Sequence, residues 1–108
     1  MNPKKKIIKK WVDALRSGKY KRGVGRLHYR PLNEYCPLGV LCDLYAIKSH
    51  KTIEQIADDD FLISKRVAQW IGIADNDPLF QTIMSANDLG SSFEQAASYI
   101  EELLNNSA

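Results

Sequence analysis

Apolar residues recur at helical spacing along most of this chain, in short stretches that turn-forming residues interrupt. In the first stretch, Trp11 lies between Ile7 and Leu15 on one apolar stripe, as in a helix that buries a single face. Further stretches are expected at residues 37–47, just after Thr52, just after Ser64, at 79–84 (a short helix or turn) and at 93–104. The pattern predicts an all-α fold, a compact bundle of about five short helices, with Trp11 and Trp70 in the core.

Capping signals predict where several of these helices begin and end. Pro37 suits a first helical position, because the amide of that position has no partner within the helix. The segments 52–55 (TIEQ) and 91–94 (SSFE) match the capping box, in which two side chains bond each other's backbone N–H groups. Gly72 and Gly90 are expected at helix C-termini, where glycine readily adopts the left-handed conformation.

Residues 18–35 are the least regular part of the chain. Three glycines, a proline and an asparagine in this segment indicate turns. Residues 27–29 are expected to form a short strand that pairs with residues near Tyr35, giving a small β-hairpin between residues 19 and 36. Gly39, in the helix that follows, is expected to allow close packing.

The length of 108 residues predicts a single helical domain spanning residues 1–108, since domains commonly hold about 100–150 residues. No apolar run approaches the roughly 20 residues that cross a bilayer, and Lys9 and Lys10 interrupt the apolar start that a signal peptide needs. A cytoplasmic protein without membrane contact is therefore expected. Cys36 and Cys42 are too few for a disulfide scaffold, and free thiols fit better.

The two parts of the chain carry opposite charge. Residues 1–30 hold 11 Lys and Arg against one acid, whereas residues 31–108 hold 4 Lys and Arg against 12 acids. A basic pole attracts anions such as phosphate, nucleic acid or an acidic protein face. The alternative is that the two parts neutralise each other within one fold. The sequence leaves both interpretations open.

The basic pole contains a glycine-rich segment, residues 16–30, which is the candidate binding site. Glycines let backbone N–H groups approach a phosphate, cations neutralise it, and tyrosines stack on bases. The P-loop pattern and the dinucleotide fingerprint are both absent, so a flexible basic loop without a ligand remains the alternative. The candidate binding residues are Arg16, Lys19, Tyr20, Lys21, Arg22, Arg26, His28, Tyr29 and Arg30.

Other chemistry-bearing residues are weaker candidates. Cys36 precedes an expected helix, where the dipole lowers a thiol pKa, and with His28 it would form a nucleophile and base; burial of a free thiol is the stronger interpretation. The run 58–60 (DDD) suits a solvated acidic turn better than a cation site. Residues 53–71 resemble a helix-turn-helix, but DNA binding by this segment is disfavoured because the acidic run within it would repel phosphate. No catalytic residue, metal site or cofactor is expected.

Four segments carry distinctive strings: WVDALRSGKY at residues 11–20, YCPLGVLCDLY at 35–45, VAQWIG at 67–72 and NDLGSSF at 87–93. They resemble a group of small proteins encoded by phages and prophages, with W-x-x-A-L-R-S-G-x-Y, Y-C-C-L-G-V-L-C, V-A-x-W-x-G and N-D-x-G-x-S-F. Pro37 departs from the group, which more often has a second cysteine there. The resemblance implies a phage setting, in which small non-enzymatic proteins often bind a host protein, including components of host defence, and some capture nucleotide signals.

Two functions remain open, and neither is enzymatic. The first is a protein that binds and modulates a host protein, as an inhibitor that counters host defence or as an adaptor, with the basic pole steering association. The second is a binder of nucleic acid or a small nucleotide through residues 16–30. Tyr20 and Tyr29 discriminate between them. If the two tyrosines lie on the surface beside the glycines, base stacking is favoured. If they pack inward, a protein partner is favoured.

Overall fold

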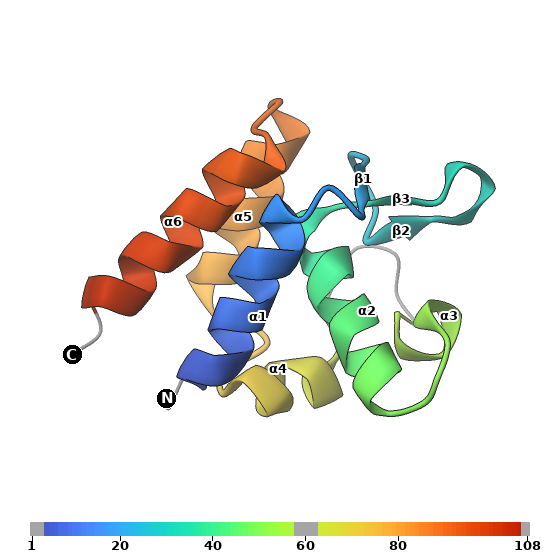
Figure 1. The fold of residues 1–108 in the computed structure, drawn as a ribbon, viewed down its shortest axis with the longest axis horizontal. Coiled ribbons are helices and arrows are strands. Elements are labelled where there is room, and N and C mark those ends of the chain that lie inside the picture. Colours follow the sequence, from blue (N-terminus) through green and yellow to red (C-terminus); the bar gives the residue numbers. More distant parts are fainter. Residues whose placement is uncertain (1–3, 58–62, 107–108) are drawn as a thin grey trace.

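The computed structural model describes residues 4–57 and 63–106, which form a mostly helical fold with one small sheet (Figure 1). The helices are α1 (Lys5–Arg16), α2 (Pro37–Lys48), α3 (Ile53–Ile56), α4 (Lys65–Ile71), α5 (Pro78–Asp88) and α6 (Phe93–Asn106). The strands are β1 (Lys21–Arg22), β2 (His28–Tyr29) and β3 (Glu34–Tyr35), and a 3₁₀ turn, η1 (Arg30–Leu32), joins β2 to β3. The predicted helical fold is confirmed in its main feature. The described residues hold six α-helices where about five were expected, and a sheet of three strands.

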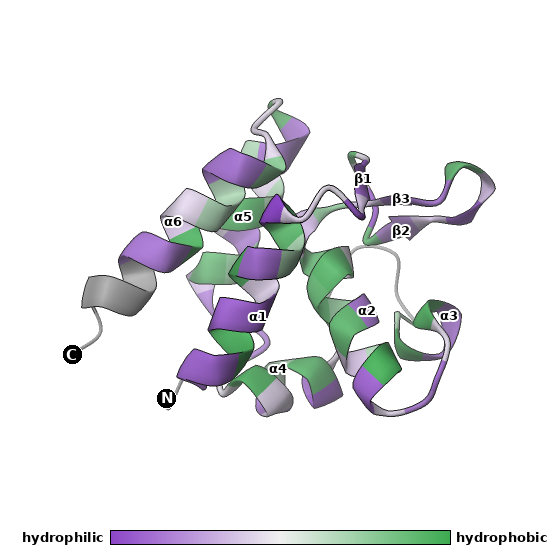
Figure 2. Ribbon diagram, in the orientation of Figure 1, coloured by the Kyte–Doolittle hydropathy of each residue, from purple (hydrophilic) through white to green (hydrophobic). Residues whose placement is uncertain are grey.

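α2 is the central helix. It is hydrophobic along most of its length (Figure 2), and every residue from Pro37 to Cys42 is buried. α1, α3, α4 and α5 all pack against it. A helix that is apolar nearly all round is stable only when other elements cover it on several sides. The buried apolar side chains of the described chain accordingly form one core around α2.

α1 and α6 lie side by side and run in opposite directions (Figure 1). Ile8 and Leu15 from α1 and Ala97 and Ile100 from α6 are all buried. Their spacing puts each pair on one face of its helix, so the two apolar stripes close over the core.

Trp11 ties α1 to the start of α2. Its side chain is fully buried, and its Nε1–H donates a hydrogen bond of 2.8 Å to the carbonyl oxygen of Pro37. The predicted core position of Trp11 is confirmed. Trp70 is only half-buried, with its ring centroid 5.4 Å from that of Tyr45. The expectation for Trp70 is confirmed only in part: this side chain packs against the core from α4 but stays partly exposed.

The sheet has the order β1-β3-β2, with β3 parallel to β1 and antiparallel to β2. The β2–β3 hairpin confirms the expected pairing near Tyr35, whereas β1 was not expected. Just before β2, the backbone of Leu27 passes so close to Gly39 that any side chain at that position would overlap the Leu27 carbonyl. The close packing predicted for Gly39 is confirmed, and it holds the hairpin against the first turn of α2.

Most of the predicted helix ends are confirmed. Pro37 is the first residue of α2, and Thr52 and Gln55 exchange the two hydrogen bonds of a capping box at the start of α3. Gly72 and Gly90 adopt the left-handed conformation, with φ angles of +79° and +107°. These ends depend on residues only a few positions apart, which explains why the sequence signals them well.

The capping box of α6 is one residue later than the predicted box at residues 91–94. Ser92 N–H donates to Gln95 Oε1 at 2.8 Å, and Gln95 N–H donates to Ser92 Oγ at 3.1 Å. The amide of Ser91 donates instead to the carbonyl oxygen of Ala86. That bond belongs to the turn that closes the C-terminus of α5, whereas Ser92 caps the N-terminus of α6.

We predict that Trp11→Phe lowers the free energy of unfolding by about 2 kcal/mol, since the Pro37 carbonyl loses its donor and the smaller ring leaves a cavity. Urea denaturation followed by circular dichroism measures the change. Trp70→Phe is the matched control and should cost clearly less, because Trp70 is only partly buried. An equal or larger cost for Trp70→Phe would contradict the role given to Trp11.

Candidate functional site

The candidate binding residues lie on and around the segment that links α1 to α2. This segment carries the small sheet, and its β2–β3 hairpin projects beyond the helices (Figure 1). We call residues 24–33 the arm. Most cations of the candidate set contact other parts of the fold, and these contacts decide which side chains are left to meet a partner.

Asn87 holds the glycine-rich segment against the end of α5. Its side chain is 1% exposed, and its Nδ2–H donates a 2.8 Å hydrogen bond to the carbonyl oxygen of Gly23. Arg22 Nη1–H donates to the Asn87 backbone oxygen at 3.0 Å and to Asn87 Oδ1 at 3.2 Å. The guanidinium thus lies at a helix C-terminus, where carbonyl groups lack partners and a positive charge is stabilised. Arg22, a candidate anion ligand, thus has its Nη1 bonded to the end of α5.

Two of the segment's glycines serve the packing of the backbone. The N–H of Gly23 donates to the Tyr35 carbonyl oxygen at 2.8 Å, and the N–H of Gly25 donates to Asp88 Oδ1 at 3.0 Å. A side chain at position 23 would overlap Glu34, and Gly25 has a φ angle of +80°. Two amides that a phosphate would need are therefore already bonded within the protein.

Arg16 connects the oppositely charged parts of the chain. Its Nε lies 3.1 Å from Glu94 Oε2 and its Nη1 lies 3.0 Å from Glu101 Oε2, both on α6. Hydrogen bonds to Glu101 and Glu94 raise the pKa of the Arg16 guanidinium. This end of the basic pole is neutralised inside the fold, as the alternative interpretation of the charge pattern expected.

Two other candidate cations also have acidic neighbours. Lys21 Nζ lies 3.6 Å from Glu34 Oε2, and Arg30 Nε lies 3.8 Å from Glu54 Oε1. Exposed pairs of this kind each contribute less than about 1 kcal/mol, so they orient the side chains more than they stabilise the fold. Lys19 is exposed.

Tyr20 packs inward. Its hydroxyl donates a 2.6 Å hydrogen bond to Asp43 Oδ2, and its ring meets that of Tyr35 edge to face with the centroids 5.0 Å apart. Burial, followed by the bond to Asp43, raises the pKa of Tyr20. Burial also raises the pKa of Tyr35 to about 12. A ring held in this way is not free to stack on a base.

Tyr29 faces outward, unlike Tyr20. It is 38% exposed, and the Arg26 guanidinium lies 5.6 Å from its ring centroid. Val24 and Leu32 are exposed on the same arm, by 56% and 55% of their surface. The arm contacts the end of α5, and the next residue there, Leu89, is 90% exposed. The arm therefore presents apolar and cationic side chains together.

The suspected pair of Cys36 and His28 is not formed. His28 Nε2 lies 2.9 Å from Asn33 Oδ1, and the His28 ring packs on Tyr35. Cys36 is buried, its sulfur accepts a hydrogen bond from the Gly39 N–H, and burial raises the pKa of its thiol to about 11. The thiol therefore stays protonated at neutral pH. Both cysteines are free and buried, which confirms the interpretation as core residues.

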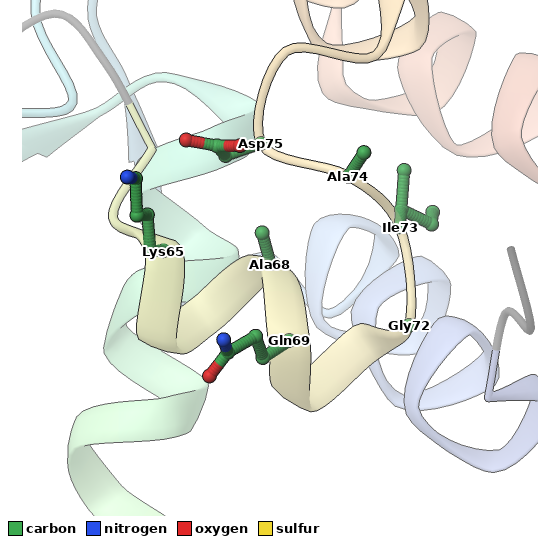
Figure 3. Close-up of a pocket in the computed structure, with 7 residues that line it drawn as sticks. All are labelled: Lys65, Ala68, Gln69, Gly72, Ile73, Ala74 and Asp75. Atoms are coloured by element: carbon green, nitrogen blue, oxygen red, sulfur yellow. The ribbon is translucent and has the colours of Figure 1, made fainter.

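A hollow of about 390 Å³ lies between α4 and the loop that follows it (Figure 3). The charged side chains that line it are Lys65 and Asp75, and the remaining lining comes from residues such as Ala68, Gln69 and Ile73. One lysine and one carboxylate among uncharged residues do not make a pair of acid and base around a reacting atom. The basic segment remains the stronger candidate site.

Several weaker candidates are only partly covered by the described residues. The acidic run 58–60 lies outside the described residues. It is the middle of the helix-turn-helix candidate, residues 53–71, and that candidate therefore stays untested. Within residues 4–57 and 63–106, no group of three or more His, Cys, Asp or Glu is placed to hold a metal ion. No helix in that part of the chain is long and apolar enough to cross a membrane.

A family model described as "Domain of unknown function (DUF8296)" matches residues 1–104. The chain belongs to this family. The match includes the arm and the end of α5 that holds it, so the contacts of Asn87 lie within the family's domain. Neither the curated proteins nor the solved structures contain a match to the chain.

The residues that bind the segment from within were not predicted from the sequence. Asn87 and Asp88 come from α5 and Asp43 comes from α2. One signal was available for Asn87, because it follows Phe80 and Ile83 at i+7 and i+4 and so lies on the buried face of α5. A polar residue on a buried face requires partners there.

We predict that Asn87→Ala lowers the free energy of unfolding by about 2–3 kcal/mol, because the Gly23 carbonyl and the Arg22 guanidinium lose a buried partner. Asp88→Ala removes one exposed bond to Gly25 and should cost less than about 1 kcal/mol. Chemical denaturation of the two variants in parallel measures both effects. Equal costs would show that the buried amide has no special role.

Stability should fall in alkaline solution. Tyr20, Tyr35 and Cys36 stay neutral in the fold, whereas the unfolded chain ionises the thiol near pH 9.0 and the phenols near pH 10.0. The unfolded state therefore releases protons first, and the free energy of unfolding falls as the pH rises from about 9 to 11. Denaturation across this window at constant ionic strength tests the prediction. Tyr20→Phe should make the fall shallower. A stability of the unmodified protein that stays constant or rises across this window would contradict the prediction.

Proposed function

We propose that the protein is a non-enzymatic module that binds and modulates a protein of the host cell, with the arm as its contact surface. One observation carries the proposal: apolar and cationic side chains occur together on a projecting segment. Three of the six large exposed apolar side chains of the described residues lie on the arm. Grouped exposed apolar side chains are a mark of interaction surfaces.

The residue types on the arm are those that dominate protein interfaces. Tyrosine and arginine contribute more binding energy at such surfaces than most other residues. Here the Arg26 guanidinium lies over the ring of Tyr29, and Leu32 follows in the turn η1. The arm is also held in place by Gly39 and Asn87 at its base. A rigid arm loses little conformational entropy when it binds.

The contacts of the glycine-rich segment disfavour the alternative, a binder of nucleic acid or a small nucleotide. The amides of Gly23 and Gly25 are bonded to other residues, and Arg22 binds the end of α5. Tyr20 packs inward, which favours a protein partner, whereas Tyr29 is exposed, the arrangement expected for base stacking. Fewer donors and one fewer stacking ring remain for an anionic ligand.

The resemblance to phage-encoded proteins supplies the class of partner in this proposal. The partner is a host protein in the cytoplasm, such as a defence component, that the module inhibits by covering its surface. The net positive charge of residues 1–30 steers the module toward an acidic surface on the partner.

The double variant Tyr29→Ala, Leu32→Ala tests the arm. Affinity purification from host lysate with the tagged protein identifies a candidate, and calorimetry with the purified candidate measures direct binding. We expect the double variant to bind about thirtyfold more weakly, which corresponds to the roughly 2 kcal/mol of an interface hot spot. Both side chains are exposed, so the fold should remain intact.

Tyr99→Ala is the matched control, because Tyr99 is exposed by the same 38% as Tyr29 but lies on α6. This variant should bind the partner as tightly as the unmodified protein. Equal affinity of the arm variant would overturn the proposal. Native mass spectrometry that shows a nucleotide bound to the purified protein would favour the alternative instead.

A further inference from the structure

A second exposed apolar surface lies far from the arm, where the N-terminal half of α1, the C-terminal half of α2 and α4 meet. A groove of about 580 Å³ runs between these helices. Its apolar lining comes from Ile7 on α1, Leu44 and Ile47 on α2, and Trp70 on α4. Ile47 is 61% exposed and Trp70 is half-buried. The groove therefore exposes apolar area that the protein's own core does not use.

Lysines line both sides of this groove. Lys4, Lys6 and Lys10 lie along the α1 side, and Lys48 lies on the α2 side. Among the residues that the structure describes, no carboxylate lines the groove and none of the four lysines forms an ion pair. Lys48 Nζ lies 5.9 Å from the Trp70 ring centroid, which keeps its charge beside the apolar lining.

We propose that this groove binds an acidic amphipathic helix of a partner protein. An amphipathic helix places its apolar stripe in a hydrophobic groove. Carboxylates on the two flanks of such a stripe would meet Lys6 and Lys10 on one side and Lys48 on the other. A single-chain amphiphile carries its charge at one end and would leave the lysines of one side without a partner. The arrangement of charge thus favours a peptide helix.

The groove is independent of the arm. Its lysines belong to the beginning of α1 and to the end of α2, whereas the arm follows the end of α1. Substitutions in the groove therefore test this inference without altering Tyr29 or Leu32. Failure of either proposal leaves the other standing.

The probe is a synthetic helical peptide with leucines at i, i+3, i+4 and i+7 and glutamates at the other positions. Trp70 fluorescence reports binding, because this side chain lines the groove, while the fully buried Trp11 supplies a constant background. A scrambled peptide of the same composition loses the apolar stripe and should bind much more weakly. A peptide with lysines in place of glutamates should not bind.

The double variant Lys6→Glu, Lys10→Glu should lower the affinity for the acidic peptide about tenfold, since two favourable charge pairs become repulsive. The matched control is Lys5→Glu, Lys9→Glu, which makes the same change in net charge on the same helix at exposed positions outside the groove. The control should bind nearly as tightly as the unmodified protein. Thermal unfolding by circular dichroism confirms that both variants fold.

Three results would overturn the inference. The first is an equal loss of affinity in both double variants, which would indicate attraction by net charge alone. The second is equal binding of the scrambled peptide. The third is that phosphatidylglycerol vesicles bind through Lys6 and Lys10 while the acidic peptide does not, which would identify a lipid surface as the occupant.

Discussion

The buried side chain of Asn87 is the contact on which the position of the arm depends. It joins α5 to the loop after β1, across 64 positions of the sequence, by donating to the Gly23 carbonyl and accepting from Arg22. A buried amide without hydrogen-bond partners loses more stability than an exposed amide gains from forming its hydrogen bonds. The site therefore accepts only a segment that offers both an acceptor and a donor. Gly23, Arg22 and the end of α5 form one structural unit, and the hairpin extends from it.

The charge asymmetry of the chain is used in two ways. Arg16 meets acids of α6 and helps to hold the two terminal helices together, so part of the positive charge is neutralised internally. Other cations are exposed, among them Arg26 in the arm and the lysines around the groove at the start of α1. Single exposed charges are weak and screened by salt. In both proposals the binding energy therefore comes mainly from the apolar side chains beside the charges, Tyr29 in the arm and Ile47 in the groove.

Local signals predicted much of the fold, because a cap or a turn depends on residues a few positions apart, as at Thr52 and Gly72. The short helix or turn predicted at residues 79–84 was too short. In the structure α5 begins at Pro78 and continues to Asp88 through mostly polar residues. The pairing of β1 with β3 and the contacts of Asn87 join distant parts of the chain, and no local pattern reports them. For the same reason, the sequence did not indicate the internal partners of Arg22 and Tyr20, which come from α5 and α2.

Amide hydrogen exchange at Gly23, followed by NMR, shows whether the glycine-rich segment is closed by its internal hydrogen bonds. We expect slow exchange, because the Gly23 N–H donates to the Tyr35 carbonyl and Asn87 holds the Gly23 carbonyl. Inorganic phosphate and a short oligonucleotide should leave the Gly23 and Gly25 resonances in place. Fast exchange at Gly23, together with a shift of these resonances on adding phosphate, would instead identify an open anion-binding loop.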